Sequence, residues 1–328
     1  MTDAGKKGMG KNFISQVICF AAGLFLLSLL VFFVSRLAPG DPLLSYYGNR
    51  VEKMSQAKRE EAERRLGLNE PLLTQYAGWL KNALKGDFGL SFKYKTEVKE
   101  VIWSRLGNTL VLGGSGFLLI FGLALLLGGI CALHEDKWPD RLLRRLGILS
   151  SCIPEFWLSL LLIFLFCAGL KILPGSGAYS PGEERNILDR LAHLILPLTV
   201  VVTGHMWYYA YLLRNCFLEE IRKDYVLLEK AKGLRDRQIL FRHCLRAILP
   251  SYLNIAALSI PHIIGGTYIV EMVFSYPGLG TLCYESARYK DYPLLMLLCL
   301  LTGGTVLLVN LGIQLLNTRI DPRLGRSR

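Results

Sequence analysis

Long apolar stretches alternate with shorter polar ones along most of this chain, and that alternation predicts its secondary structure. A helix needs roughly 20 mostly apolar residues to cross a lipid bilayer. Six segments meet this length, at approximately residues 13–34, 108–133, 146–170, 191–213, 251–270 and 294–316. The sequence therefore predicts an all-α integral membrane protein with six transmembrane helices.

The polar segments divide the chain into an N-terminal part, an insert and a core. These parts are residues 1–36 with the first span, residues 37–106 as a water-exposed insert, and residues 107–328 with the other five spans. Within the insert, the pattern predicts a charged helix over residues 54–66 and an amphipathic helix over residues 72–84.

The core contains one long basic loop, residues 214–250, between the fourth and fifth spans. Asp224 is a predicted N-cap, and Val226, Leu227 and Lys230 are expected on one face of a short helix. Gly233 predicts a stop, because glycine enters left-handed conformations without a side-chain penalty. A second amphipathic helix is expected after it, with apolar positions at Ile239, Leu240, Cys244, Leu245 and Ile248, and with Pro250 opening the next span. Two helices around one defined bend are typical of a docking element.

Charge distribution predicts the orientation of the chain. The net charge is +12, but the basic residues gather beside span ends, which argues for membrane topology and against nucleic-acid binding. With the N-terminus in the cytoplasm, the inner loops 134–145 and 214–247 hold 13 Lys and Arg residues, and the outer loops 171–190 and 271–292 hold five. Both termini and the loop 214–250 are therefore expected on the cytoplasmic side, and the insert on the other.

The sequence shows no motif for a metal site, a nucleotide site or a catalytic site of its own. The eight cysteines show no metal-ligand spacing, and residues 5–11 match a phosphate-binding loop only until Asn12, where Ser or Thr is needed. An ion-coupled transporter needs charged residues inside its spans, where only Glu155, His205 and His262 stand out. A membrane enzyme needs a polar catalytic cluster, and none is evident. Neither alternative finds its chemistry here.

Several stretches resemble one family of membrane proteins, the permease subunits of bacterial ABC importers, in the branch that imports di- and oligopeptides or nickel. In the loop these are residues 231–234 (Ala-Lys-Gly-Leu), 240–243 (Leu-Phe-Arg-His) and 249–250 (Leu-Pro); elsewhere they are residues 36–42, 86–91, 153–158, 271–280, 290–293 and 321–323. Leu227, Leu228 and Glu229 stand where the family usually has Glu-Ala-Ala, so the loop departs from the common pattern there.

The resemblance implies a transport subunit that is not itself an enzyme and that lies in the bacterial inner membrane. Its implied partners are a homologous second permease, two cytoplasmic ATPases that bind the ATP and Mg²⁺, and an extracytoplasmic substrate-binding protein. The chain itself is expected to bind no cofactor. The insert either caps the helix bundle or also meets the binding protein. The residues expected to couple to the ATPase are Asp224, Tyr225, Glu229, Ala231, Lys232, Gly233, Leu234 and Arg242.

The resemblance leaves the substrate less well defined. Residues 265–271 and 87–89 are more similar to the nickel branch, so a metal or metal chelate is expected, with a di- or oligopeptide as the alternative. An autonomous secondary transporter is a further alternative. The residues expected to face the pathway or substrate are His262, Gly265, Gly266, Thr267 and Glu271, and no set of metal ligands is predicted.

Overall fold

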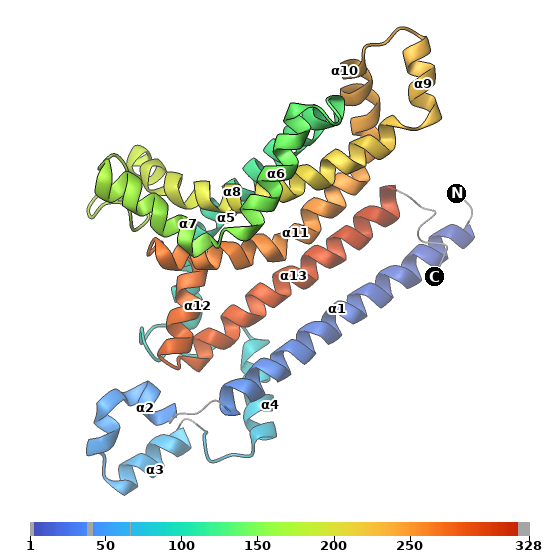
Figure 1. Cartoon of the computed structure of the whole chain (residues 1–328). Coiled ribbons are helices and arrows are strands. Elements are labelled where there is room, and N and C mark those ends of the chain that lie inside the picture. The colour runs from blue at the N-terminus through green and yellow to red at the C-terminus, as the bar shows by residue number, and fades with distance from the viewer. Residues whose placement is uncertain (1–2, 38–41, 66, 321–328) are drawn as a thin grey trace. The chain divides into compact units, whose positions relative to one another are not determined.

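The computed structural model describes residues 3–37, 42–65 and 67–320, and over this part the chain is almost entirely helical (Figure 1). An isolated bridge between Leu90 and Glu97 is the sole β-type pairing found there. The chain forms two compact units, residues 1–107 with 278–311, and residues 108–277 with 312–328. The family-like ending at residues 321–323 lies outside the described residues.

The first unit combines the insert with the two terminal helices. Its elements are α1 (Asp3–Leu37), α2 (Pro42–Tyr47), the 3₁₀ helix η1 (Gly48–Lys53), α3 (Gln56–Arg65), α4 (Leu72–Ala83), the first turns of α5 (Val98–Leu133), α12 (Leu279–Arg288) and most of α13 (Tyr292–Ile320). The charged helix and the amphipathic helix predicted for the insert are therefore both present, as α3 and α4.

Aromatic packing and one buried hydrogen bond hold α4 against α1. The Tyr76 ring contacts Phe32 edge-on with centroids 5.3 Å apart, and it stacks on Trp79 at 6.0 Å. At the base of this cluster the hydroxyls of Ser28 and Tyr76 lie 2.8 Å apart and share a hydrogen bond. Because a Tyr hydroxyl is costly to bury without a partner, this pair fixes where α4 sits on the first span.

The second unit contains the rest of the spans. Its elements are the remainder of α5, α6 (Trp138–Cys152), α7 (Glu155–Leu162), the π-helix η2 (Ile163–Gly169), α8 (Ile187–Ile221), α9 (Asp224–Ala231), α10 (Asp236–Ile239), the π-helical turn η3 (Leu240–Cys244) and α11 (Leu245–Val273). Residues such as Phe121, Val200, Val201, Ala210 and Leu213 form its buried core.

Gly128 lies at a close approach of two backbones, between α5 and α8. A Cβ atom at Gly128 would lie 2.9 Å from the carbonyl oxygen of Ala210 and 3.0 Å from the amide nitrogen of Arg214. Both are backbone atoms, which cannot rotate away as a side chain can. Small residues permit such contacts between membrane helices, and here nothing larger than glycine fits.

Within the described residues, five helices are long and apolar enough to cross a membrane, and a bent pair makes a sixth span if its two halves are counted as one. The bent pair, residues 138–150 and 155–169, turns through 98° at the predicted third span. The predicted span over residues 146–170 is therefore broken into two helices at this point. Pro154 disfavours the α conformation at the residue before it, and Ile153 is extended, with φ −93° and ψ 115°.

Other boundaries also differ from the sequence expectation. Helix α5 begins at Val98, ahead of the predicted start of the second span at residue 108, and its first turns group with the insert in the first unit. Pro250 lies inside α11 and does not open it, because the loop's second helix runs on through η3 into the fifth span. Glu271 also lies inside α11, and the segment between α11 and α13 contains α12.

Candidate functional site

The loop between α8 and α11 is the part of the second unit that most resembles a docking element. In Figure 1, α9 and α10 lie at the end of α8 and α11 that is far from α7. Helix α9 follows α8 after two residues, and Gly233 separates it from α10. The predicted short helix, glycine bend and second helix are thus all present. The second helix continues without a break into α11.

Helix α9 ends in a complete Schellman motif. Gly233 has φ +84°, in the left-handed region. Its amide donates to the carbonyl of Lys230 at 2.9 Å, and the amide of Leu234 donates to the carbonyl of Glu229 at 3.3 Å. These two bonds satisfy carbonyls that a helix end otherwise leaves free. The bend is therefore a fixed geometry and not a slack connection.

The start of α9 differs from the prediction. Lys223 occupies the N-cap position with extended backbone (φ −78°, ψ 149°), and Asp224 is already in the first helical turn. Asp224 is therefore not the cap. Its carboxylate lies instead where the positive end of the helix dipole favours negative charge. The ammonium of Lys223 donates to Glu220 Oε2 at 2.6 Å, linking the junction back to α8.

One face of α9 is buried against α8 and the helix that follows. Val226 is fully buried in a cluster with Phe217, Ile239 and Leu240. Beside it, the hydroxyl of Tyr225 donates to Cys244 Sγ at 3.6 Å. Burial, with smaller contributions from Cys244 and Glu220, raises the pKa of Tyr225, so the phenol stays protonated at neutral pH. These contacts hold α9 firmly against the spans.

The opposite face of α9 is apolar and uncovered. Leu227 is 65% exposed and Leu228 57% exposed, and Ala231 and Lys232 beside them are exposed too. The expected common face of Val226, Leu227 and Lys230 is therefore wrong, because Val226 is buried while the other two face outward. The Leu227–Leu228 pair is the exposed apolar face of the loop.

Charged side chains around this face pair with one another. The ammonium of Lys232 donates to Glu229 Oε1 at 2.9 Å and lowers the pKa of that carboxyl, so Glu229 is ionised at neutral pH. Lys230 lies 3.1 Å from Asp236 across the glycine bend. Leu234 is half-buried against the Val226 cluster, whereas Arg242 is exposed on η3.

A buried ion pair joins the first turn of α6 to the C-terminal part of α8, and no local sequence pattern predicted it. Arg214 donates to both carboxylate oxygens of Asp140, from Nε and from Nη2, each at 2.6 Å. Asp140 is fully buried and also accepts from the amide of Asp136 at 2.9 Å. The partners are 74 positions apart, so the composition of the turn at residues 134–145 did not indicate which residue would pair with Asp140.

The candidate pathway residues do not form one cluster. His262 and Gly265 are exposed on α11, and Gly266 follows in the same helix. Thr267 is buried, and its hydroxyl donates to the carbonyl of Ile264 at 2.9 Å. Glu271 is fully buried and accepts from the Thr109 hydroxyl at 2.7 Å, which ties α11 to α5.

Two ionisable residues singled out from the spans lie together. Glu155 Oε1 and His205 Nδ1 are 3.5 Å apart, where α7 packs on α8. Within the described residues, no group of three or more His, Cys, Asp and Glu side chains is arranged to hold a metal ion.

Comparison with known proteins matches most of the chain. Residues 124–326 match the family described as binding-protein-dependent transport system inner membrane component, and residues 9–113 match the N-terminal part described for the same kind of component. The oligopeptide transport system permease protein AppB of Bacillus subtilis is 36% identical over 299 residues, covering 91% of this chain and 94% of that protein.

Two other relatives have similar coverage. The dipeptide transport system permease protein DppB of Alkalihalophilus pseudofirmus is 30% identical over 91% of this chain and 94% of its own length. The glutathione transport system permease protein GsiC of Escherichia coli K12 is 31% identical over 95% and 97%. Among solved structures, a chain of the inward-facing MetNI methionine ABC transporter superposes with a TM-score of 0.53 at 16% identity, over 68% of this chain and 97% of that one.

Proposed function

The chain belongs to the inner-membrane permease family of binding-protein-dependent ABC importers, and we propose that its substrate is a di- or oligopeptide. It is a multi-pass transport subunit and not an enzyme, since ATP hydrolysis belongs to separate ATPase subunits. The family implies ATPases, a substrate-binding protein and a second permease as partners. The relatives named above, for oligopeptide, dipeptide and glutathione transport, support the peptide alternative; they give no support to the nickel preference.

In this proposal the loop around α9 is the contact with a cytoplasmic ATPase. The observation that supports it most is the exposed pair Leu227 and Leu228 on a helix whose other face is buried and whose end is fixed by Gly233. A docking helix needs an uncovered apolar face and a stiff mounting, and α9 has both. The excess of basic residues in the loop supports its cytoplasmic placement, together with both termini.

The proposed mechanism converts ATPase closure into movement of the spans. ATP and Mg²⁺ are bound by the ATPases, whose closure displaces α9. Tyr225 and Val226 pass that displacement to α8 and to the helix through Ile239 and Leu240. The pathway then opens alternately to each side of the membrane. Nothing in this sequence of events requires a charged relay within the permease, which fits the scarcity of such residues in its spans.

Substrate choice is tested with the assembled transporter. The chain, its co-encoded permease, both ATPases and the binding protein are reconstituted in vesicles and supplied with ATP. We expect uptake of a radiolabelled dipeptide or short oligopeptide and no uptake of radiolabelled nickel. Nickel accumulation without peptide accumulation would contradict the peptide assignment. Accumulation by this chain alone, without ATPases, would contradict the ABC importer mechanism itself.

The docking face makes a separate prediction. Leu227→Asp should weaken binding of the ATPase by at least about tenfold, because a buried leucine side chain contributes roughly 1.5–3 kcal/mol and a charge in its place opposes burial. Affinity between purified permease and ATPase is measured directly. Leu188→Asp is the matched control, since Leu188 is also exposed but lies at the first turn of α8, away from the loop. Equal losses in both variants would show that α9 is not the docking face.

A further inference from the structure

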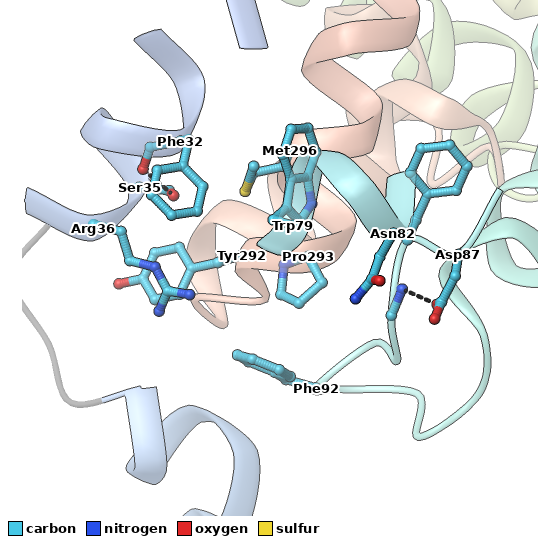
Figure 2. Close-up of a pocket in the computed structure, with 12 residues that line it drawn as sticks. Phe32, Ser35, Arg36, Trp79, Asn82, Asp87, Phe92, Tyr292, Pro293 and Met296 are labelled. Atoms are coloured by element: carbon cyan, nitrogen blue, oxygen red, sulfur yellow. Dashed lines mark hydrogen bonds between the residues drawn. The ribbon is translucent and has the colours of Figure 1, made fainter. Parts of the chain in front are cut away.

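The first unit has a partly open cavity of about 180 Å³ that the transport mechanism above does not use (Figure 2). It lies where the C-terminal end of α1, the α4 helix, the turn at residues 87–92 and the first turn of α13 come together. Its lining is mostly aromatic and apolar and includes Phe32, Arg36, Trp79, Asp87, Tyr292 and Met296. Three stretches that the sequence singled out, at residues 36–42, 86–91 and 290–293, contribute residues to this one place.

The walls of the cavity are fixed by buried polar contacts. Ser91 donates from Oγ to Asp291 Oδ2 at 2.5 Å, and the amide of Lys93 donates to the same oxygen at 3.1 Å. Asp291 and Ser91 are both fully buried, so these bonds join the turn to the start of α13 with little freedom. Phe32, Trp79 and Met296 complete a packed aromatic side. The cavity is therefore preformed.

The guanidinium of Arg36 is the cationic group among these aromatic side chains. The Arg36 guanidinium lies over the Phe32 ring, 5.4 Å from its centroid, and near Tyr292 (Figure 2). Within the described ranges no carboxylate lies at ion-pair distance from Arg36. Asp87, the one acid among the described lining residues, accepts from the amide of Gly89 at 3.0 Å and lies across the cavity from Arg36. A partly buried guanidinium that no described carboxylate approaches favours a ligand that supplies an anion.

The position of the cavity along the spans indicates that the anion is a lipid headgroup. The apolar span of α1 runs over Ser15–Leu37 and that of α13 begins at Tyr292, so the cavity lies where one span ends and the other starts. This is the depth of the lipid headgroups. Trp and Tyr are enriched at that level, where the lining has Trp79 and Tyr292. A guanidinium at this level suits a lipid phosphate, which it binds through charge-assisted hydrogen bonds.

We propose that this cavity binds the headgroup of an anionic phospholipid, with the phosphate on Arg36 and the headgroup against Trp79 and Tyr292. Phe32 and Met296 then contact the glycerol end of the lipid. The lipid would stabilise the packing of α4 and of the turn at residues 87–92 against α1 and α13. This inference does not depend on which substrate the transporter carries.

The test measures lipid binding by the purified full-length chain in detergent. The probes are short-chain phosphatidylglycerol, phosphatidylcholine of the same chain length, and inorganic phosphate, and the readouts are native mass spectrometry and the shift in unfolding temperature. Phosphatidylglycerol should bind best, and Arg36→Gln should weaken it by at least about tenfold, the value expected for a charge-assisted hydrogen bond. Arg36→Lys should keep part of the binding. Arg105→Gln, in the same unit but outside the lining, should bind as the wild type does.

Each alternative outcome overturns the proposal in a recognisable way. Equal binding of phosphatidylglycerol to Arg36→Gln and wild type would place the lipid elsewhere. Inorganic phosphate that binds as tightly as the lipid would make this a free-anion site. If the purified substrate-binding protein binds the wild type but not Arg36→Gln, and phosphatidylglycerol does not shift the unfolding temperature, the cavity is a protein-docking site. Unchanged circular dichroism of Arg36→Gln shows that its lost binding is not lost folding.

Discussion

Replacing Gly233 with proline should stop ATP-driven uptake by the assembled transporter while ATP hydrolysis continues. Proline fixes φ near −65°, whereas Gly233 has φ +84°, and proline lacks the amide that donates to Lys230. Both bonds of the Schellman motif depend on this geometry. The end of α9 must therefore rearrange, and a displaced α9 no longer passes movement to the spans. The measurement is the ratio of substrate imported to ATP hydrolysed, in vesicles.

Gly233→Asn is the matched control for this variant. Asparagine tolerates the left-handed region better than other side chains, and nothing lies within 4 Å of a Cβ atom added at Gly233. Uptake by Gly233→Asn should stay within about threefold of wild type, since its backbone cost is small compared with the roughly 1–2 kcal/mol for ordinary residues. Normal coupling in Gly233→Pro, with the protein correctly inserted, would refute a rigid bend as the transmitting element.

Removing Arg214 should destabilise the folded chain by about 3–5 kcal/mol, the range measured when one partner of a buried ion pair is lost. Arg214→Leu leaves Asp140 fully buried, with Arg144 as its remaining cation at 3.4 Å. Unfolding of the purified chain, followed by circular dichroism against denaturant, measures the change.

The double variant Asp140→Leu with Arg214→Leu separates charge burial from packing. Replacing a whole buried pair by apolar residues is often neutral, so the double variant should recover most of the lost stability. Arg144→Leu, whose side chain is 40% exposed, should cost less than about 1 kcal/mol. If the double variant is as unstable as Arg214→Leu, the loss comes from the arginine's packing and not from the stranded carboxylate of Asp140.

Local signals predicted the elements of the docking loop well. The bend at Gly233 follows from the conformation of one residue and its nearest amides, so glycine between two helical patterns was sufficient to place it. Asp224 was misplaced by one position, because either it or Lys223 can precede the first turn. Val226 and Leu227 were assigned to one face because periodicity alone does not say which side of a short helix meets α8.

Long-range contacts were beyond the sequence pattern. Nothing near Asp140 indicates that Arg214 lies against it, since the pairing depends on how α6 packs on α8. The break at Ile153 and Pro154 had a local signal, but a proline inside an apolar run is also compatible with a continuous span, as Pro250 and Pro261 in α11 demonstrate. The cavity beside Arg36 required three distant stretches to meet.

The close backbone contact at Gly128 determines how movement of α8 spreads to its neighbouring helices. Because the backbones of α5 and α8 touch there, neither helix can slide past the other without a steric collision. Arg214, whose amide forms part of that contact, also grips Asp140 on α6. A displacement of the C-terminal end of α8 is therefore transmitted to α5 and α6, and the three helices move as one rigid body.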